Sequence, residues 1–221
     1  IITGYTKEAG VRNLERKIGD ICRKTARKIL EEKEGTVLVT KENLSDFLGR
    51  EKYTYQQKNK NDEVGIVRGL AWTSVGGDTL QIEVNLMPGK GEFLLTGQLG
   101  DVMAGNYGIE PEFFQKHDLH IHIPEGAVPK DGPSAGITMA TAMLSAITKT
   151  PVKAGVAMTG EITLRGRVLP IGGLKEKLLA AKSAGILKVL IPQENRPDIE
   201  EMDKEITQGL EIIPVSTMEE V

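Results

Sequence analysis

The strongest constraint on the fold is a run of strict alternation between apolar and polar residues. In residues 79–87, TLQIEVNLM, the apolar positions are Leu80, Ile82, Val84 and Leu86. Successive side chains of a strand point to opposite faces, so the run predicts a strand with one buried face. The segments VGIVRGLAW, EFLLTG and DLHIHIP are predicted to be neighbouring strands.

Helical patterns follow the alternating segments. Residues 135–148, AGITMATAMLSAIT, predict an apolar helix, and LKEKLLAAKSAG predicts a second one that starts after Gly172-Gly173 and ends at Gly185. Strand-like runs separate or follow these helices: GVAMTGEI, LRGRVLPI, ILKVLIP and GLEIIPV. Strands interleaved with helices indicate an α/β or α+β protein, and we predict α+β.

The first fifty residues have a different pattern. Apolar residues recur every three or four positions from Val11 to Ile29, which predicts an amphipathic helix with Cys22 as a buried small residue. A short strand over 36–39 and a second helix opening near Thr40, with Glu42 in its first turn, are expected next. Residues 51–62 offer almost nothing to bury, so we predict a small helical domain over 1–50, a linker over 51–62 and a larger domain over 63–221.

Composition narrows the classes of function. The 28 basic and 31 acidic residues give a formal net charge of −3, which supplies no global field for nucleic acid. The single cysteine permits no intrachain disulfide and favours a reducing, cytosol-like compartment. Neither a membrane span nor a signal peptide is predicted. The chain starts at Ile1 without a methionine, so we expect a fragment of a longer protein.

Ser134 is the first candidate for chemistry. It lies in PKDGPSAG, residues 129–136, between a turn-forming Asp-Gly-Pro and the apolar helix. One interpretation is that its hydroxyl caps the helix, which serine does readily. The other is that it is a nucleophile, because unpaired N–H groups at a helix start can stabilise an oxyanion. The motif alone leaves both interpretations open.

A nucleophilic serine needs a base. A histidine could serve only if it reached Ser134, and His120 and His122 share the outward face of a predicted strand, with His117 nearby. No third ligand supports a metal site there, so we expect structural or surface roles for this pair and no metal. The helix after Gly173 offers Lys175, Lys177 and Lys182. Lys177 has small apolar residues along its face, which would desolvate its amine, whereas a solvated lysine face is the ordinary alternative.

Several long motifs together resemble the proteolytic domain of Lon protease, A type, bacterial branch. These are PKDGPSAG, MTGEITLRGRVLPIGGLKEKLLAA, GLAWTSVGGDTLQIEVNLMPGKG and LTGQLGDVM. GYTKEAGVRNLERKIGDICRKTARKIL resembles the small helical lid subdomain of the AAA+ ATPase module in the same family. The resemblance covers nearly the whole chain and implies a lid subdomain followed by a mixed α/β proteolytic domain.

The resemblance implies a Ser-Lys dyad, with Ser134 as nucleophile and Lys177 as base. Thr159 matches a threonine beside the lysine amine, and Asp131 matches the acidic residue of the serine motif, where Gly132 and Pro133 form the turn. Arg12 matches an arginine that reaches the nucleotide in the complete ATPase. ATP with magnesium is thus implied for the full-length protein, whereas no cofactor is expected for this chain, which has no phosphate-binding loop.

The family also implies partners and a place in the cell. Unfolded or damaged proteins are the implied substrates, in cytoplasmic protein quality control and stress response, and the implied assembly is a homohexameric ring without membrane association. DNA binding is associated with the full-length family, but the charge of this chain does not support it. We expect this chain to cut only unstructured polypeptides. The alternative is a catalytically silent module for assembly or substrate docking.

Two positions depart from the family pattern. Only residues 104–107, AGNY, lie between QLGDVM and GIEPEFF, where the family has a helix of several turns. We expect either that this helix has been deleted and replaced by a short connector, or that the protein has the helix and it is left out of the residues numbered here. The second departure is Gly155, where family members often carry an acidic residue.

Overall fold

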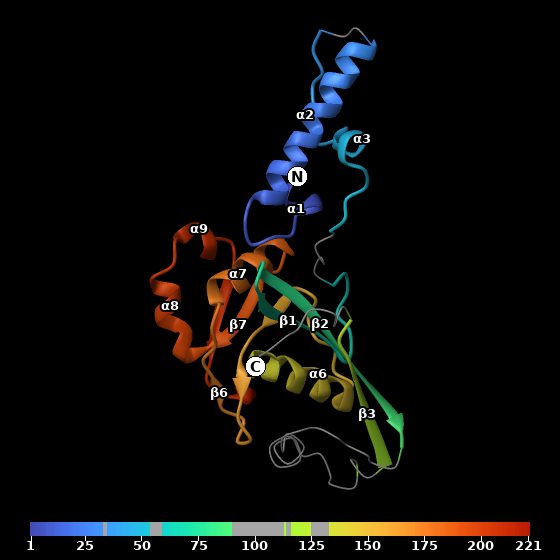
Figure 1. The fold of residues 1–221 in the computed structure, drawn as a ribbon. Helices are drawn as coiled ribbons and strands as arrows, with labels where there is room; N and C mark the ends of the chain where they lie inside the picture. Colours follow the sequence, from blue (N-terminus) through green and yellow to red (C-terminus); the bar gives the residue numbers. More distant parts are fainter. Residues whose placement is uncertain (33–34, 54–58, 90–112, 114–115, 125–132) are drawn as a thin grey trace. The chain divides into compact units, whose positions relative to one another are not determined.

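The computed structural model describes residues 1–32, 35–53, 59–89, 113, 116–124 and 133–221 (Figure 1). They form two compact units, residues 1–56 and 57–221. The predicted strand EFLLTG, the connector at 104–107, Asp131 and Gly132 all lie outside the described residues. Within the described residues, no helix is both long enough and apolar enough to cross a bilayer.

The first unit is helical, as predicted. Its elements are α1 (Ile2–Tyr5), α2 (Arg12–Glu32) and α3 (Leu44–Leu48). The start of α2 is stabilised by the Glu8 carboxylate, which accepts the N–H groups of Asn13 and Leu14 at 2.9 Å each. These N–H groups have no partner inside the helix, so a carboxylate there satisfies them and complements the helix dipole.

Three details of the predicted first unit are wrong. Cys22 is exposed rather than buried, because two short helices are too small to cover the apolar face of α2. Residues 36–39 form no strand, and α3 begins at Leu44 instead of near Thr40. The N–H of Thr40 is bonded to the Asn43 side chain at 2.8 Å, which makes a turn where the helix was expected to begin.

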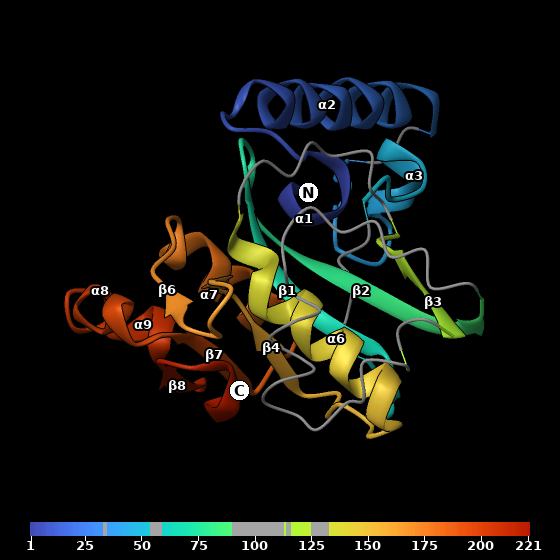
Figure 2. The same ribbon diagram turned by 90° about the horizontal axis from the view of Figure 1, so that it is seen from below.

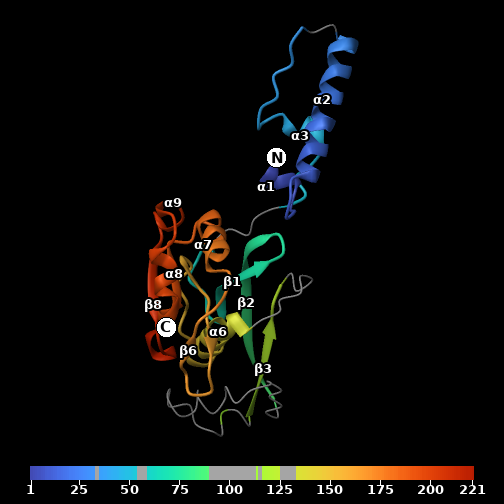
Figure 3. The same ribbon diagram turned by 60° about the vertical axis from the view of Figure 1, so that its left-hand side comes forward.

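Within the described residues, the second unit is built on a six-stranded sheet in the order β3-β2-β1-β4-β7-β8. The strands are β1 (Ile66–Thr73), β2 (Gly76–Pro88), β3 (His117–His122), β4 (Val156–Met158), β7 (Lys188–Pro192) and β8 (Glu211–Val215). Figure 3 shows β3 and β8 at opposite edges. The pairs among β1, β2 and β3 are antiparallel, and the remaining pairs are parallel. The alternating run of residues 79–87 is confirmed as part of β2.

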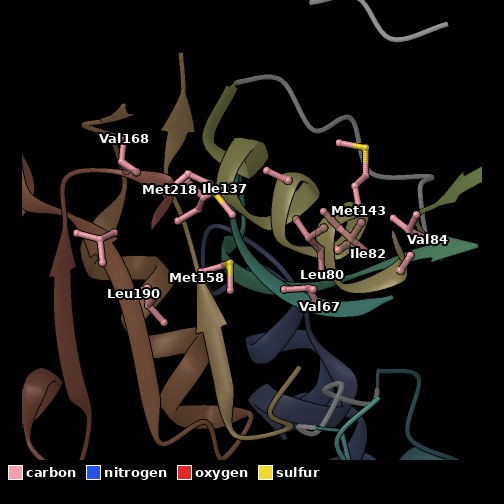
Figure 4. Close-up of a cluster of buried hydrophobic side chains, with 14 of the residues drawn as sticks. Val67, Leu80, Ile82, Val84, Ile137, Met143, Met158, Val168, Leu190 and Met218 are labelled. Atoms are coloured by element: carbon pink, nitrogen blue, oxygen red, sulfur yellow. The ribbon is translucent and has the colours of Figure 1, made fainter. Parts of the chain in front are cut away.

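Among the described elements, one long helix covers each face of this sheet. Val189 and Ile191 of β7 pack in a cluster with Leu178 of α7 (Leu174–Ser183), whereas Leu190 between them packs in a cluster with Ile137 of α6 (Gly136–Thr148). Neighbouring strand residues point to opposite faces, so the two helices lie on opposite sides of the sheet. Figure 2 shows α6 running across β1 and β2, and Figure 4 shows the apolar side chains between them.

Smaller elements complete the second unit. A two-stranded hairpin is formed by β5 (Glu161–Ile162) and β6 (Val168–Leu169), and the connection from β7 to β8 contains α8 (Arg196–Glu200) and α9 (Lys204–Thr207). Both of these short helices were missed in the sequence, because neither has the length that makes periodicity visible. The mixture of a helical unit and a mixed sheet confirms the α+β class.

Candidate functional site

A cavity of about 220 Å³ opens in the second unit, next to the start of both sheet-covering helices. Its walls come from four parts of the chain: Trp72, Pro133, Ser134, Glu161, Pro170, Ile171, Gly172 and Lys177. The cavity lies where the parallel strands β1 and β4 end, which is the usual place for a ligand site in such sheets. It brings together Ser134 and Lys177, which were both predicted as site residues.

Ser134 sits in a turn of 3₁₀ helix, Pro133–Ala135, that leads into α6. The capping interpretation is wrong, because the N-cap residue of α6 is Ala135 and no side chain caps this helix. The backbone of Ser134 is held from the neighbouring strand segment: its carbonyl accepts the Gly160 N–H at 2.9 Å and the Thr159 hydroxyl at 3.2 Å. The serine is half-buried at the cavity wall, with its hydroxyl left without a capping role.

Gly136 allows this helix start to approach the hairpin closely. A Cβ at this position would lie 2.7 Å from the Ile162 backbone nitrogen, closer than side-chain carbons come to other atoms. Any other residue would therefore push the serine-bearing turn away from β5.

Lys177 projects from the first turns of α7 and is only 2% exposed. The predicted small apolar face is confirmed, since Ala180, Ala181 and Ala184 are all buried beside it. Burial lowers the pKa of Lys177 to about 8 from its ordinary value of 10.5, because the charged form is poorly solvated there. Lys175, two residues earlier, is exposed.

No carboxylate within the described part of the chain forms an ion pair with the Lys177 ammonium. A nearby negative charge would favour the protonated amine and raise the pKa of Lys177. Because none of these residues supplies such a charge, burial has the dominant influence on this pKa. About half of the molecules then hold a neutral amine near pH 8. A neutral amine in a cavity with a serine hydroxyl is what general-base chemistry requires.

The position of Lys177 depends on a close contact between α7 and the β1–β2 hairpin. A Cβ on Gly77 of β2 would lie 1.9 Å from the Glu176 carbonyl oxygen and 3.0 Å from the Lys177 nitrogen. The hairpin therefore reaches the backbone of α7 only because residue 77 has no side chain.

The remaining predicted residues are distributed as follows. Thr159 is fully buried and bonded to the Ser134 carbonyl, while its contact with the Lys177 amine stays a prediction. Pro133 lines the cavity, and Asp131 and Gly132 lie outside the described residues. The histidines of β3 at positions 120 and 122 are exposed, and the described residues contain no cluster of three metal-ligating side chains.

Arg12 lies exposed at the first residue of α2 in the other unit. One arginine supplies a single phosphate contact, whereas a nucleotide also needs a backbone cradle and a group that holds its metal ion. The described residues therefore do not by themselves fit ATP with magnesium.

Five cavity residues were not predicted as site residues: Trp72, Glu161, Pro170, Ile171 and Gly172. Trp72 is exposed at the end of β1, Glu161 belongs to the two-residue strand β5, and Ile171 lies in the segment before α7. Trp72 is the single tryptophan of the sequence, but its exposure beside the cavity is evident only in the structure. Glu161 and Ile171 become neighbours of Ser134 only through the tertiary fold.

A serine hydroxyl and a buried lysine of lowered pKa lie at one cavity, and these are the two groups that the class of serine-lysine hydrolases uses. The family comparison agrees with this class. The model of the Lon protease (S16) C-terminal proteolytic domain matches residues 38–221, and that of the Lon protease AAA+ ATPase lid domain matches residues 1–37. The chain belongs to the Lon protease family.

Curated relatives are similar along the whole chain. Lon protease of Lachnoclostridium phytofermentans is 55% identical over 274 residues, Lon protease 1 of Bacillus subtilis is 55% identical over 235, and Lon protease of Clostridioides difficile is 54% identical over 236. Each match includes 100% of this chain but only 34%, 30% and 30% of the respective relative. The chain spans about a third of the length of these relatives.

Proposed function

We propose that this chain is the peptide-cleaving part of an ATP-dependent Lon protease and acts as a serine endopeptidase. The observation that carries the proposal is the shared cavity of Ser134 and Lys177, in which burial lowers the lysine pKa to about 8. An exposed lysine would remain protonated at neutral pH and could not accept a proton from serine.

The reaction follows from these groups. Neutral Lys177 takes the proton of the Ser134 hydroxyl as the oxygen attacks a peptide carbonyl, and N–H groups at the start of the α6 segment stabilise the oxyanion. The protonated lysine then gives its proton to the leaving amine, and an acyl-serine remains. Water, deprotonated by the same lysine, releases the second product. The Thr159 hydroxyl keeps the serine backbone in place throughout.

An unstructured substrate fits the edge of β1 beside the cavity. Strand β4 pairs with β1 only at Arg68 and Gly69, so residues 70–73 lack a neighbouring strand on that side within the described residues. An extended polypeptide can add to such an edge through backbone hydrogen bonds, which read no particular sequence. The exposed Trp72 gives it an aromatic surface at the cavity mouth.

The wider role is proposed from the family. In the full-length protein, ATP with magnesium would drive the unfolding of damaged or regulatory proteins within a cytoplasmic hexameric ring. This chain holds no phosphate-binding loop, so its cleavage of an already unfolded polypeptide is expected to proceed without ATP.

Cleavage of an unfolded polypeptide tests the proposal. Casein is incubated with the chain and with the Ser134→Ala and Lys177→Ala variants, and fragments are followed by mass spectrometry. We expect cleavage by the parent chain and by neither variant. Circular dichroism checks that both variants are folded. If the parent neither cuts casein nor is labelled at Ser134 by a fluorophosphonate, the chain is a silent assembly or docking module instead.

A further inference from the structure

The wall of the cavity between β6 and α7 is formed by residues 170–172. This segment belongs to no helix or strand and leads directly into the helix that carries Lys177. A wall of irregular backbone stays in place only if something else in the fold satisfies its polar groups. The Lys177 environment therefore depends on what fixes this segment.

The side chain of Asn195, from a distant part of the chain, holds residues 170–172 in place. Its side-chain oxygen accepts the Ile171 N–H at 2.9 Å, and its side-chain nitrogen donates to the Ile171 carbonyl at 2.9 Å. The amide thus makes the same two bonds to Ile171 that a residue of a neighbouring strand would make. Asn195 is 5% exposed and lies in the 3₁₀ turn Gln193–Asn195 after β7.

A third bond fixes the amide itself. The Asn195 nitrogen also donates to an oxygen of Asp198 at 2.6 Å, so the side chain cannot rotate without losing partners at both ends. All three bonds are made by one terminal group, and only an asparagine of this length offers both a donor and an acceptor there. The arrangement joins the β7–α8 connection to the cavity wall.

We propose that Asn195 is a positioning residue for the Lys177 base, acting through the backbone of Ile171. The inference rests on the proposed function, since it concerns how the lysine amine is kept dry and aimed at the serine. Residues 170–172 shield one side of the cavity that Lys177 lines. If the wall loosens, water reaches the amine, and better solvation of the ammonium raises its pKa toward the ordinary value.

The test compares fluorophosphonate labelling rates of Ser134 between pH 6 and 11 in the full chain and in Asn195→Ala. We expect the midpoint of the profile to move upward by about one pH unit, so that labelling at pH 8 is about fivefold slower while the rates converge above pH 10. A residue that merely stabilises the fold would lower the amount of folded protein without moving the midpoint. If Asn195→Ala does not fold, Asn195→Leu, which keeps a similar size, adds no charge and removes both bonds to Ile171, carries the same test.

Two matched controls isolate the contact with Ile171. Ser145 lies near the far end of α6, and its buried hydroxyl also makes two bonds to backbone groups, those of Gly65 and Thr150. Ser145→Ala should therefore lower the stability and leave the midpoint of the labelling profile unchanged. Asp198→Ala removes only the third bond and should keep the parent midpoint. An unshifted midpoint in folded Asn195 variants overturns the inference, whereas a parent chain that is not labelled at all overturns the proposed function.

Discussion

Lys177 destabilises the second unit at neutral pH because its side chain is buried. Its pKa is about 8 in the folded chain and 10.5 in its ordinary state, so between these values the unfolded chain binds more protons and stability rises with pH. Below pH 8 the full penalty of about 3 kcal/mol applies. We predict that Lys177→Met, which fills the same space without a charge, raises the free energy of unfolding by about 1–3 kcal/mol at pH 7.

The gain in that variant should shrink as the pH approaches 10, where the folded lysine is neutral and the unfolded lysine has begun to lose its proton. Urea unfolding at pH 7 and pH 10 measures it. Lys175→Met is the matched control on the same helix, because Lys175 is exposed and its replacement should leave the pH dependence unchanged. If the gain of Lys177→Met over the parent is smaller at pH 7 than at pH 10, the result would contradict the burial of a charged Lys177.

Thr159 provides a second prediction at the residue scale. Thr159→Val keeps the shape of this fully buried side chain but removes the bond to the Ser134 carbonyl. We expect a loss of about 1–2 kcal/mol in the free energy of unfolding and a slower labelling of Ser134, because the serine turn is held by one bond fewer. Thr159→Ser keeps the hydroxyl and should label at a rate near that of the parent.

Single residues were predictable where a local pattern determines their environment. The helical spacing predicts that the alanines lie on the same face of the helix as Lys177, and the structure shows that they are buried there. The cap interpretation of Ser134 failed because the choice between a cap and a 3₁₀ turn depends on bonds from Thr159 and Gly160, which lie far along the sequence. The role of Asn195 was likewise hidden, since its partner is twenty-four residues away.

At the scale of elements, the contact between the β1–β2 hairpin and α7 determines where the lysine lies. Gly77→Ala would place a methyl group 1.9 Å from the Glu176 carbonyl, so the helix and the hairpin must separate. We predict a loss of about 1–3 kcal/mol in stability together with slower labelling of Ser134. Gly155→Ala is the control, because its new methyl group meets only Leu187, at 3.9 Å, and both properties should stay near the parent values.

Elements were predictable in proportion to the length of their pattern. The long strand β2 and the helices α2, α6 and α7 each span enough residues for a period to be visible in the sequence. The run at 36–39 is rich in β-branched residues, yet no strand pairs with it, and pairing is what a sheet requires. Strand propensity without a partner therefore gave a wrong prediction.

At the scale of the whole molecule, the larger unit holds every described wall residue of the cavity and both apolar clusters. We predict that residues 57–221 alone fold and are labelled at Ser134 at a rate within about twofold of the full chain, because every described cavity residue lies in that unit. Thermal unfolding and labelling of the truncated chain check this. An unfolded or unreactive truncation would show that the helical unit is needed for the site.

The central claim is that Lys177, kept neutral by burial, activates Ser134. The most direct measurement is the pH dependence of Ser134 labelling by a fluorophosphonate in the parent chain, in Lys177→Met and in Lys175→Met. We predict a rate that rises with pH through a midpoint near 8 in the parent and in Lys175→Met, and that is lost in Lys177→Met. A parent profile that stays flat across pH 8, or a midpoint that survives in Lys177→Met, would contradict the account.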